Sequence, residues 1–398
     1  MKRLLILQYG DVRAALRAFA EGRQETYYDQ RRSVGFWTDR AAAGTEITIA
    51  YPVDEAAYRE VVSTGLTCVG VPSRHFYDGG LGGDLIETSR AEAVIVGGPH
   101  LPMLTAARAA GLPVYANFAD VFRPLGFGAV TRREGLRRAR EHWRLRRLLG
   151  APNVTAIGNH SLGASRSLHE VLRLPKARIT PWEWTPFPTV PRVQPFCEDG
   201  LRLVYAGTLS EAKGVGDLLR AVALLRDGGA GVTLTLFGEG QDRLMLEEEA
   251  NRLQLGRAVR FEGLQPNDVV RAAMAGADAV TVPSRPAYAE ALPNVISEAL
   301  SVGTPLVISD HPAFAFRFTP GEAALVAPPA DPGALARTLG RLLREPGLAE
   351  ALSSRTAEVL AGLRFGSLWY DLMQAFLDDP TDKTGWVARH SLAALERR

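Results

Sequence analysis

The feature that most constrains the fold of this chain is a sequence unit that occurs once in each half. In the first half, the apolar run at residues 91–98 is followed by a helical pattern, a Gly-x-Pro turn and another apolar run. In the second half, the run at 277–284 leads through a similar stretch to the turn at 303–305. Short Val/Ile/Leu/Ala runs that alternate with amphipathic stretches indicate parallel sheets covered by helices. The sequence therefore predicts an α/β protein with two similar doubly wound domains.

A proline-spaced segment separates the two halves. Five prolines lie between residues 181 and 195, and proline fixes φ and has no N–H, so this segment cannot form a helix or a central strand. We expect an N-terminal domain over residues 1–185, a linker over 186–199 and a C-terminal domain over 200–366. The last stretch, 367–398, has a helical pattern without strands and is expected to cross back to the N-terminal domain.

The overall composition argues against several classes of function. A net charge of +2 over 398 residues is too small for a dedicated nucleic-acid-binding protein. Cys68 and Cys197 are too few for a disulfide framework or a metal cluster, so we expect both to be reduced and the protein to be cytoplasmic. We find no apolar run near the roughly 18 residues that a membrane span needs.

One predicted helix, over residues 132–149, is strongly basic. It carries eight arginines, interleaved with leucines and Trp143. Such a helix can lie on the inner, anionic face of a membrane as a peripheral contact, or collect an acidic acceptor. A solvated face on an Arg-rich surface helix is the alternative.

The turn after the first strand of the C-terminal domain carries a candidate phosphate ligand. Gly207 allows close backbone approach, and Lys213 lies near the N-terminus of a helix expected from Asp217. A lysine at this position can hold a phosphate with the help of the helix dipole and backbone N–H groups. A surface lysine on an ordinary βα turn is the alternative. Neither a Walker loop nor a dinucleotide fingerprint is present.

Two glutamates, Glu290 and Glu298, flank the start of a second helix, which is expected to open at Pro293. Proline suits the first helical position but has no N–H, so the amides of Asn294 and Val295 are the expected anion donors. An ionised glutamate would repel a diphosphate. Glu298 is therefore better suited to ribose hydroxyls, and Glu290 to sugar hydroxyls or a developing positive charge.

These elements together resemble the GT-B-fold retaining glycosyltransferases of family 4, the glycosyl transferases group 1 domain. The similarity is close from about residue 201 to residue 343. The pieces that carry it are residues 207–214, 236–240, 259–263, 277–284, 290–300 and 303–307. The resemblance implies two Rossmann-like domains that face a central cleft. It also implies transfer of a hexose-type sugar from a UDP- or GDP-linked donor to an unidentified acceptor, with no metal ion and no cofactor.

The resemblance also assigns roles to individual residues. Lys213 would hold the diphosphate, Glu298 the ribose and Glu290 the donor sugar, while Glu239 would lie near the nucleoside and the backbone at Gly263 near the base. The expected catalytic residues are Glu290, Lys213 and His100. The expected donor-binding residues are Gly10, Gly207, Thr208, Lys213, Glu239, Gly263, Leu264, Leu292, Asn294, Val295 and Glu298.

Three positions depart from the family pattern. Thr208 stands where many members have arginine, Ala291 where glycine is usual, and Ala119 where a histidine often precedes aspartate. His100 is the nearest candidate to replace that histidine, although a lone histidine on a loop is more often structural. A GT-B epimerase or phosphorylase and a non-catalytic subunit that binds a nucleotide sugar are the alternatives.

Overall fold

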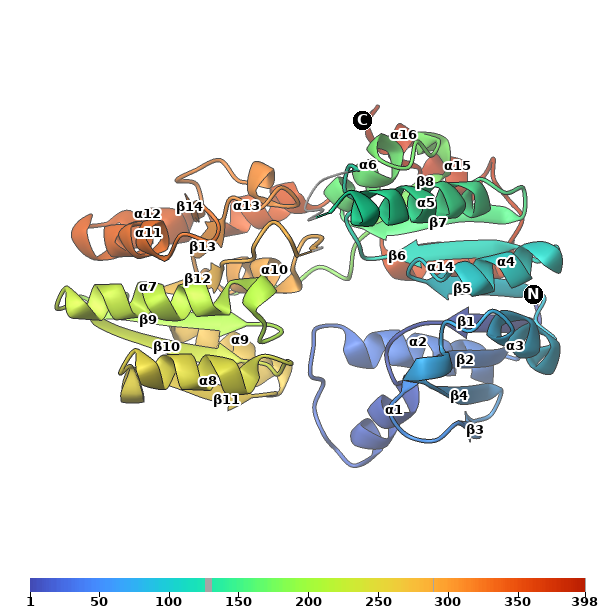
Figure 1. The fold of residues 1–398 in the computed structure, drawn as a ribbon, viewed down its shortest axis with the longest axis horizontal. Coiled ribbons are helices and arrows are strands. Elements are labelled where there is room, and N and C mark those ends of the chain that lie inside the picture. Colours follow the sequence, from blue (N-terminus) through green and yellow to red (C-terminus); the bar gives the residue numbers. More distant parts are fainter. Residues whose placement is uncertain (126–130, 289, 398) are drawn as a thin grey trace. The chain divides into compact units, whose positions relative to one another are not determined.

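The computed structural model of the chain describes residues 1–125, 131–288 and 290–397, which divide into two compact units. The first unit comprises Met1–Glu25, Asp29–Thr185 and Phe365–Arg398, and the second comprises Thr26–Tyr28 and Pro186–Arg364 (Figure 1). The residues expected to form a linker pack on the second unit. Val190 N donates to the Ser301 carbonyl at 2.7 Å, and Arg192 Nη1 donates to the Ala277 carbonyl at 2.7 Å.

An eight-stranded sheet forms the centre of the first unit. Its strands are β1 (Arg3–Leu7), β2 (Glu46–Val53), β3 (Tyr58–Ser63), β4 (Leu66–Pro72), β5 (Ala93–Gly97), β6 (Val114–Phe118), β7 (Val154–His160) and β8 (Ile179–Trp182). Their spatial order is β3-β4-β2-β1-β5-β6-β7-β8. All neighbours are parallel except β3 and β4, which are antiparallel. The strands contribute apolar side chains to both faces because helices cover both.

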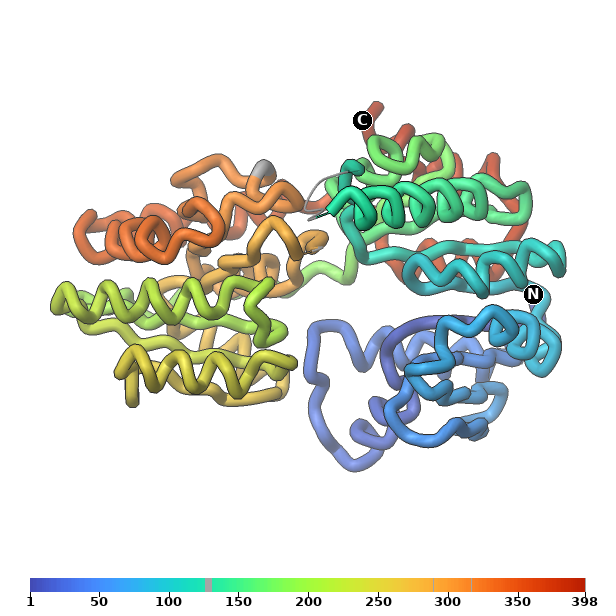
Figure 2. Tube along the Cα trace, in the orientation of Figure 1, coloured from blue at the N-terminus to red at the C-terminus, as the bar shows by residue number. Residues whose placement is uncertain are grey.

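Two helical layers cover this sheet. One contains α1 (Val12–Ala20), α2 (Gln30–Ala42), α14 (Trp369–Asp378) and α15 (Trp386–Arg389). The other contains α3 (Leu81–Ser89), α4 (Leu101–Ala109), α5 (Arg132–Leu149), α6 (Leu162–Glu170) and α16 (Leu392–Leu395). The Cα trace in Figure 2 follows the C-terminal segment, in red, to the first unit, where α16 packs against α6 and β8.

The second unit has a six-stranded sheet in which every neighbouring pair is parallel. Its strands are β9 (Gly200–Ala206), β10 (Gly231–Phe237), β11 (Val259–Gly263), β12 (Ala279–Val282), β13 (Leu306–Ser309) and β14 (Ala324–Ala327). One face carries α7 (Val215–Asp227), α8 (Arg243–Arg252), α11 (Pro332–Arg344) and α12 (Leu348–Ser354). The other carries α9 (Asn267–Gly276), α10 (Asn294–Ser301) and α13 (Thr356–Leu363) (Figure 1).

The order of the second sheet, β11-β10-β9-β12-β13-β14, reverses direction between β9 and β12. Open parallel sheets bind ligands at the carboxyl ends of the strands beside such a reversal. The predicted repeat corresponds to β5-α4-β6 and β12-α10-β13. Gly111 and Gly303 follow the two helices with φ of 66° and 74°, which glycine adopts without strain. The predicted α/β fold with two parallel-sheet domains is confirmed.

Among the described residues, none of the helices combines the length and the hydropathy that crossing a lipid bilayer would require.

Candidate functional site

A cavity of about 420 Å³ lies in the second unit, at the carboxyl ends of β9 and β10 and beside the start of α10. Lys213 and the first turn of α10 line this same cavity. The sequence-predicted residues that it brings together are Gly207, Thr208, Lys213, Glu239, Leu264, Glu290, Asn294, Val295 and Glu298. Two elements that are far apart in the chain thus share one crevice at the reversal of the sheet.

Lys213 and Glu290 form an ion pair inside this cavity. Lys213 ends a short 3-10 turn (Glu211–Lys213), and its Nζ donates to Glu290 Oε1 at 2.5 Å. Both side chains are largely buried, with exposed fractions of 13% and 8%. Ser284 Oγ donates to the other carboxylate oxygen at 2.6 Å, and the Tyr288 ring lies 4.5 Å from the ammonium. An anion that binds Lys213 must therefore compete with Glu290 for the ammonium.

The helix after Lys213 begins earlier than expected. It starts at Val215 rather than at Asp217, because Gly214 takes the left-handed conformation with φ of 74° and serves as the N-cap. Asp217 consequently lies in the first turn, where its carboxylate meets the positive end of the helix dipole. Because Gly214 is the N-cap, Lys213 lies immediately before the capping residue of the helix.

The N-terminus of α10 supplies the second anion-binding element. Pro293 is the N-cap rather than the first helical residue, so the helix starts one residue later than expected. Asn294 and Val295 are its first two residues. The first N–H groups of a helix have no carbonyl partner within it. Together with the helix dipole they make this end suitable for a phosphate.

Glu298 lies one turn further along α10 and is buried, with 6% exposure. Asn267 Nδ2 donates to Glu298 Oε1 at 2.9 Å and so fixes the orientation of the carboxylate. Asn267 is the first residue of α9 and also lines the cavity. The sequence analysis missed this residue, because its side chain reaches its partner only after the sheet has formed.

The loops after β9, β10 and β11 form another side of the cavity. Gly207 and Gly238 are in close backbone contact, since a Cβ at Gly238 would lie 2.0 Å from the Gly207 carbonyl oxygen. Glu239 lines the cavity and forms an ion pair with Arg243. The Cβ of a residue larger than glycine at 263 would lie 3.0 Å from the Glu239 carboxylate. The loop at Gly263 is therefore adjacent to Glu239, although Gly263 and Leu292 are outside the described cavity lining.

Two predicted residues, Gly10 and His100, belong to the first unit. His100 is fully buried at the N-cap of α4; its Nε2 bonds the Phe76 carbonyl at 2.6 Å and its Nδ1 accepts from Met103 N at 3.1 Å. Burial lowers the pKa of His100, which keeps the ring neutral. With both nitrogens engaged, the geometry favours the structural alternative over a catalytic role.

A second missed feature is the segment Thr26–Tyr28, which belongs to the second unit although it lies near the start of the chain. Tyr28 stacks on Phe187 with ring centroids 3.8 Å apart, and its hydroxyl donates to the Pro186 carbonyl at 2.8 Å. Thr26 and Tyr27 line the cavity. No local motif marks this segment, so only the tertiary structure reveals it.

Comparison with known proteins gives consistent similarities. Residues 187–359 match the protein family described as Glycosyl transferases group 1. Glycogen synthase of Mycobacterium tuberculosis is 33% identical over 148 residues, which are 37% of this chain and 35% of that protein. The match thus spans about a third of the length of the mycobacterial relative.

Two further similarities extend over more of the chain. The 2-deoxystreptamine glucosyltransferase of Streptomyces kanamyceticus is 29% identical over 281 residues, 66% of this chain and 67% of that protein. The solved structure of Anabaena HepE in complex with UDP and glucose has a TM-score of 0.64 at 16% sequence identity. That structural match covers 95% of this chain and 100% of the other, and it shows a shared fold.

Proposed function

Because this chain is a GT-B protein that carries a glycosyl transferases group 1 domain, we propose that it transfers a hexose-type sugar from a nucleoside-diphosphate sugar to an acceptor. One observation carries the proposal. The Lys213 ammonium, the Glu290 carboxylate and the open end of α10 line a single cavity beside the reversal of a parallel sheet. A diphosphate needs fixed positive charge and free N–H donors, and both are present there.

The residues of the cavity support a division of labour. Lys213 and the N-terminus of α10 stabilise the negative charge that develops on the departing nucleoside diphosphate, which is an electrostatic form of catalysis. Glu290 binds donor-sugar hydroxyls or faces the positive charge that develops at the anomeric carbon. Glu298, oriented by Asn267, accepts hydrogen bonds from the ribose.

We also propose the stereochemistry and the metal requirement of the reaction. The bond from the anomeric carbon to the diphosphate breaks, and the acceptor hydroxyl forms its bond to that carbon from the same face. Its proton passes to the leaving phosphate, so the sugar is transferred with retention. The ammonium of Lys213 and the dipole of α10 supply the positive charge that a metal ion supplies in other transferases, so no metal is required.

The donor base can be identified by ligand-induced stabilisation. UDP is the first probe, because the similar HepE structure is a complex with UDP and glucose. A ligand at a hundred times its dissociation constant adds about 2.7 kcal/mol to the free energy of unfolding. We therefore expect a clear rise in melting temperature with UDP or UDP-glucose in a panel that includes GDP and GDP-mannose. A panel in which no nucleotide raises the melting temperature would contradict the proposal.

A further proposal concerns α5, which we expect to lie on an anionic lipid surface. Leu136, Arg140, Trp143 and Arg147 fall at spacings of four, three and four residues and so share one stripe of the helix. Leu136 and Trp143 are 59% and 60% exposed, and the Arg147 guanidinium lies 5.6 Å from the centroid of the Trp143 ring. An exposed tryptophan flanked by arginines is typical of helices that bind membrane interfaces.

Vesicle binding tests this placement. The wild type is expected to co-sediment with vesicles that contain phosphatidylglycerol, and much less with pure phosphatidylcholine. Each basic residue near such a surface contributes about 1 kcal/mol, so the double charge reversal Arg140→Glu/Arg147→Glu should weaken binding by at least about tenfold. The double reversal Arg257→Glu/Arg260→Glu, at exposed positions of the second unit, makes the same change in net charge and is the matched control. Equal binding of the double variant and the control would refute the proposal.

A further inference from the structure

The two loops that carry Lys213 and Glu290 are in direct backbone contact. Arg285 N donates to the Ala212 carbonyl at 3.0 Å. A Cβ at Gly214 would lie 2.1 Å from the carbonyl oxygen of Pro283, so only glycine permits this approach. The position of one loop relative to the other therefore sets the distance between the Lys213 ammonium and the Glu290 carboxylate.

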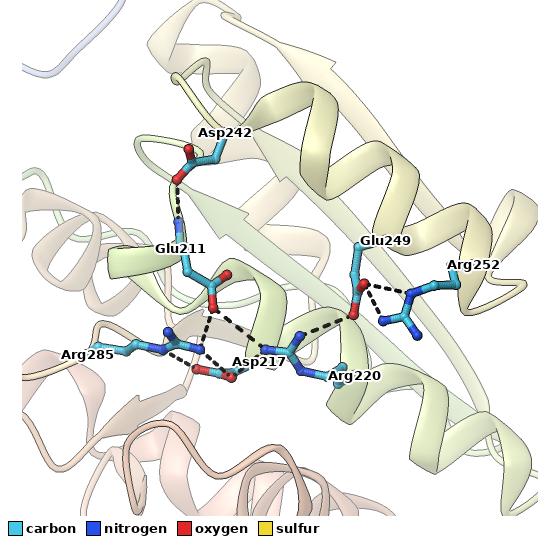
Figure 3. A network of polar contacts seen from close by, with 7 residues as sticks. All are labelled: Glu211, Asp217, Arg220, Asp242, Glu249, Arg252 and Arg285. Atoms are coloured by element: carbon cyan, nitrogen blue, oxygen red, sulfur yellow. Dashed lines mark hydrogen bonds and ion pairs between the residues drawn. The ribbon is translucent and has the colours of Figure 1, made fainter.

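An ion-pair cluster fastens these loops to each other (Figure 3). Arg285 donates from Nε to Asp217 Oδ2 at 2.7 Å and from Nη2 to Asp217 Oδ1 at 2.9 Å. The same Nη2 lies 2.6 Å from Glu211 Oε1. Glu211 and Asp217 thus bracket Lys213 in the chain, and Arg285 comes five residues before Glu290. We define Glu211, Asp217 and Arg285 as the clasp.

The clasp extends to a third loop and to the helix behind it. Asp242, at the N-cap of α8, accepts a hydrogen bond from Glu211 N at 2.8 Å. Arg220 contacts Asp217 Oδ1 at 2.9 Å and Glu249 Oε1 at 3.1 Å. Figure 3 shows these residues converging from α7, α8 and the loop after β12. None of these residues belongs to the described cavity lining, so the cluster lies outside the cavity.

Asp217 is an unusual residue to bury in a helix that packs on a sheet. Its side chain is only 5% exposed. Burial by itself raises the pKa of Asp217, but hydrogen bonds from Arg285 and Arg220 outweigh burial and hold the pKa below its ordinary value. Buried ion pairs seldom stabilise a fold more than apolar residues of similar size, so the cluster calls for a role other than stability.

Building on the proposed function, we infer that the clasp is a positioning device for the donor site. It holds the Glu290 loop at the distance from Lys213 at which both groups can engage one activated sugar. A displacement of about 1 Å in such a site costs about a hundredfold in rate. Arg285 and Asp217 are thus positioning residues that act through Lys213 and Glu290.

A first test uses the ligand-free protein. Arg285→Met and Asp217→Asn each remove one side of the clasp. Amide hydrogen exchange at residues 285, 288 and 290, whose N–H groups are hydrogen-bonded within or between the two loops, then reports the mobility of the Glu290 loop. Asp278→Asn is the matched control, because Asp278 is also buried and pairs with Arg202 at 2.7 Å, but it lies at the amino end of β12, whereas the site lies at the carboxyl ends of the strands. We expect faster exchange at residues 285, 288 and 290 in both clasp variants and unchanged exchange there in the control.

A second test measures UDP affinity by titration calorimetry in a double-mutant cycle with Lys213→Ala. Arg285→Met also releases the Lys213 loop, so its ammonium is no longer held at the diphosphate. UDP binding should then weaken by about tenfold, the effect of losing one charge-assisted hydrogen bond. In the Lys213→Ala background the same change should have little further effect, because the clasp acts through Lys213. Asp278→Asn should leave UDP affinity unchanged in both backgrounds.

The outcomes separate this inference from the proposed function. Unchanged exchange at residues 285, 288 and 290 in both clasp variants would overturn the positioning role, whether or not UDP binds. An equal loss of UDP affinity in the wild-type and Lys213→Ala backgrounds would also overturn it. Faster exchange in a protein that binds neither UDP nor GDP would support the clasp and count against the proposed function instead.

Discussion

Replacing Lys213 by alanine is expected to slow sugar transfer by about a hundredfold to a thousandfold. Lys213 is the only lysine between residues 186 and 364. Within the described cavity lining, its ammonium is the cation that can stabilise the negative charge developing on a leaving diphosphate. Loss of one preorganised electrostatic donor costs about 10²–10³ in kcat. UDP affinity should fall as well, since the ground-state diphosphate uses the same ammonium. Initial rates of UDP release from the donor identified by the panel, together with calorimetric titration of UDP, measure both effects.

Two further variants separate chemistry from stability in this experiment. Lys213→Ala leaves the Glu290 carboxylate buried without its cation, and breaking a buried pair costs about 3–5 kcal/mol. Lys213→Arg keeps the charge and should retain part of the activity. Lys176→Ala removes an ammonium that pairs with Glu396 at 2.6 Å in the first unit, and it should leave turnover unchanged. Wild-type turnover in a folded Lys213→Ala protein would remove Lys213 from the mechanism.

The fold could be predicted from the sequence because its signals are local. The apolar run at 279–282 is a strand over the same residues, Ala279–Val282, since parallel strands buried on both faces read as continuous apolar runs. Gly303 follows α10 because only glycine adopts φ of 74° there without strain. Helix starts were harder to predict. The pattern placed the start of α7 at Asp217, whereas the left-handed Gly214 permits a start two residues earlier.

The candidate site could be predicted only where its residues lie in local motifs. The turn at Lys213 and the helix after Glu290 each follow a recognisable strand, so their meeting at one sheet edge could be expected. The residues that orient these two elements could not be predicted from the sequence. Asn267 lies 31 residues from Glu298, and Arg285 lies 68 residues from Asp217. Their spacing carries no periodicity, and only the packed sheet brings them together.

Removing the charge of Glu290 should have opposite effects on turnover and on UDP binding. Glu290→Gln keeps the shape of the side chain and an oxygen that can accept the Ser284 hydroxyl hydrogen bond, but it ends the ion pair with Lys213. Without that carboxylate, the ammonium is no longer neutralised in the free protein. UDP should then bind about tenfold more tightly, a gain of about 1.4 kcal/mol.

Turnover should fall in the same variant, because a carboxylate that faces the donor sugar is lost at the stage when positive charge develops. We expect kcat to drop by about 10²–10³, the magnitude seen when one preorganised electrostatic group is removed. Glu345→Gln makes the same change in net charge at an exposed pair with Arg341 on α11 and is the control for both measurements. If UDP binds the Gln variant no better than the wild type, Glu290 does not compete with the diphosphate. If kcat is retained, the sugar depends on other groups of the cavity, and the ion pair is structural.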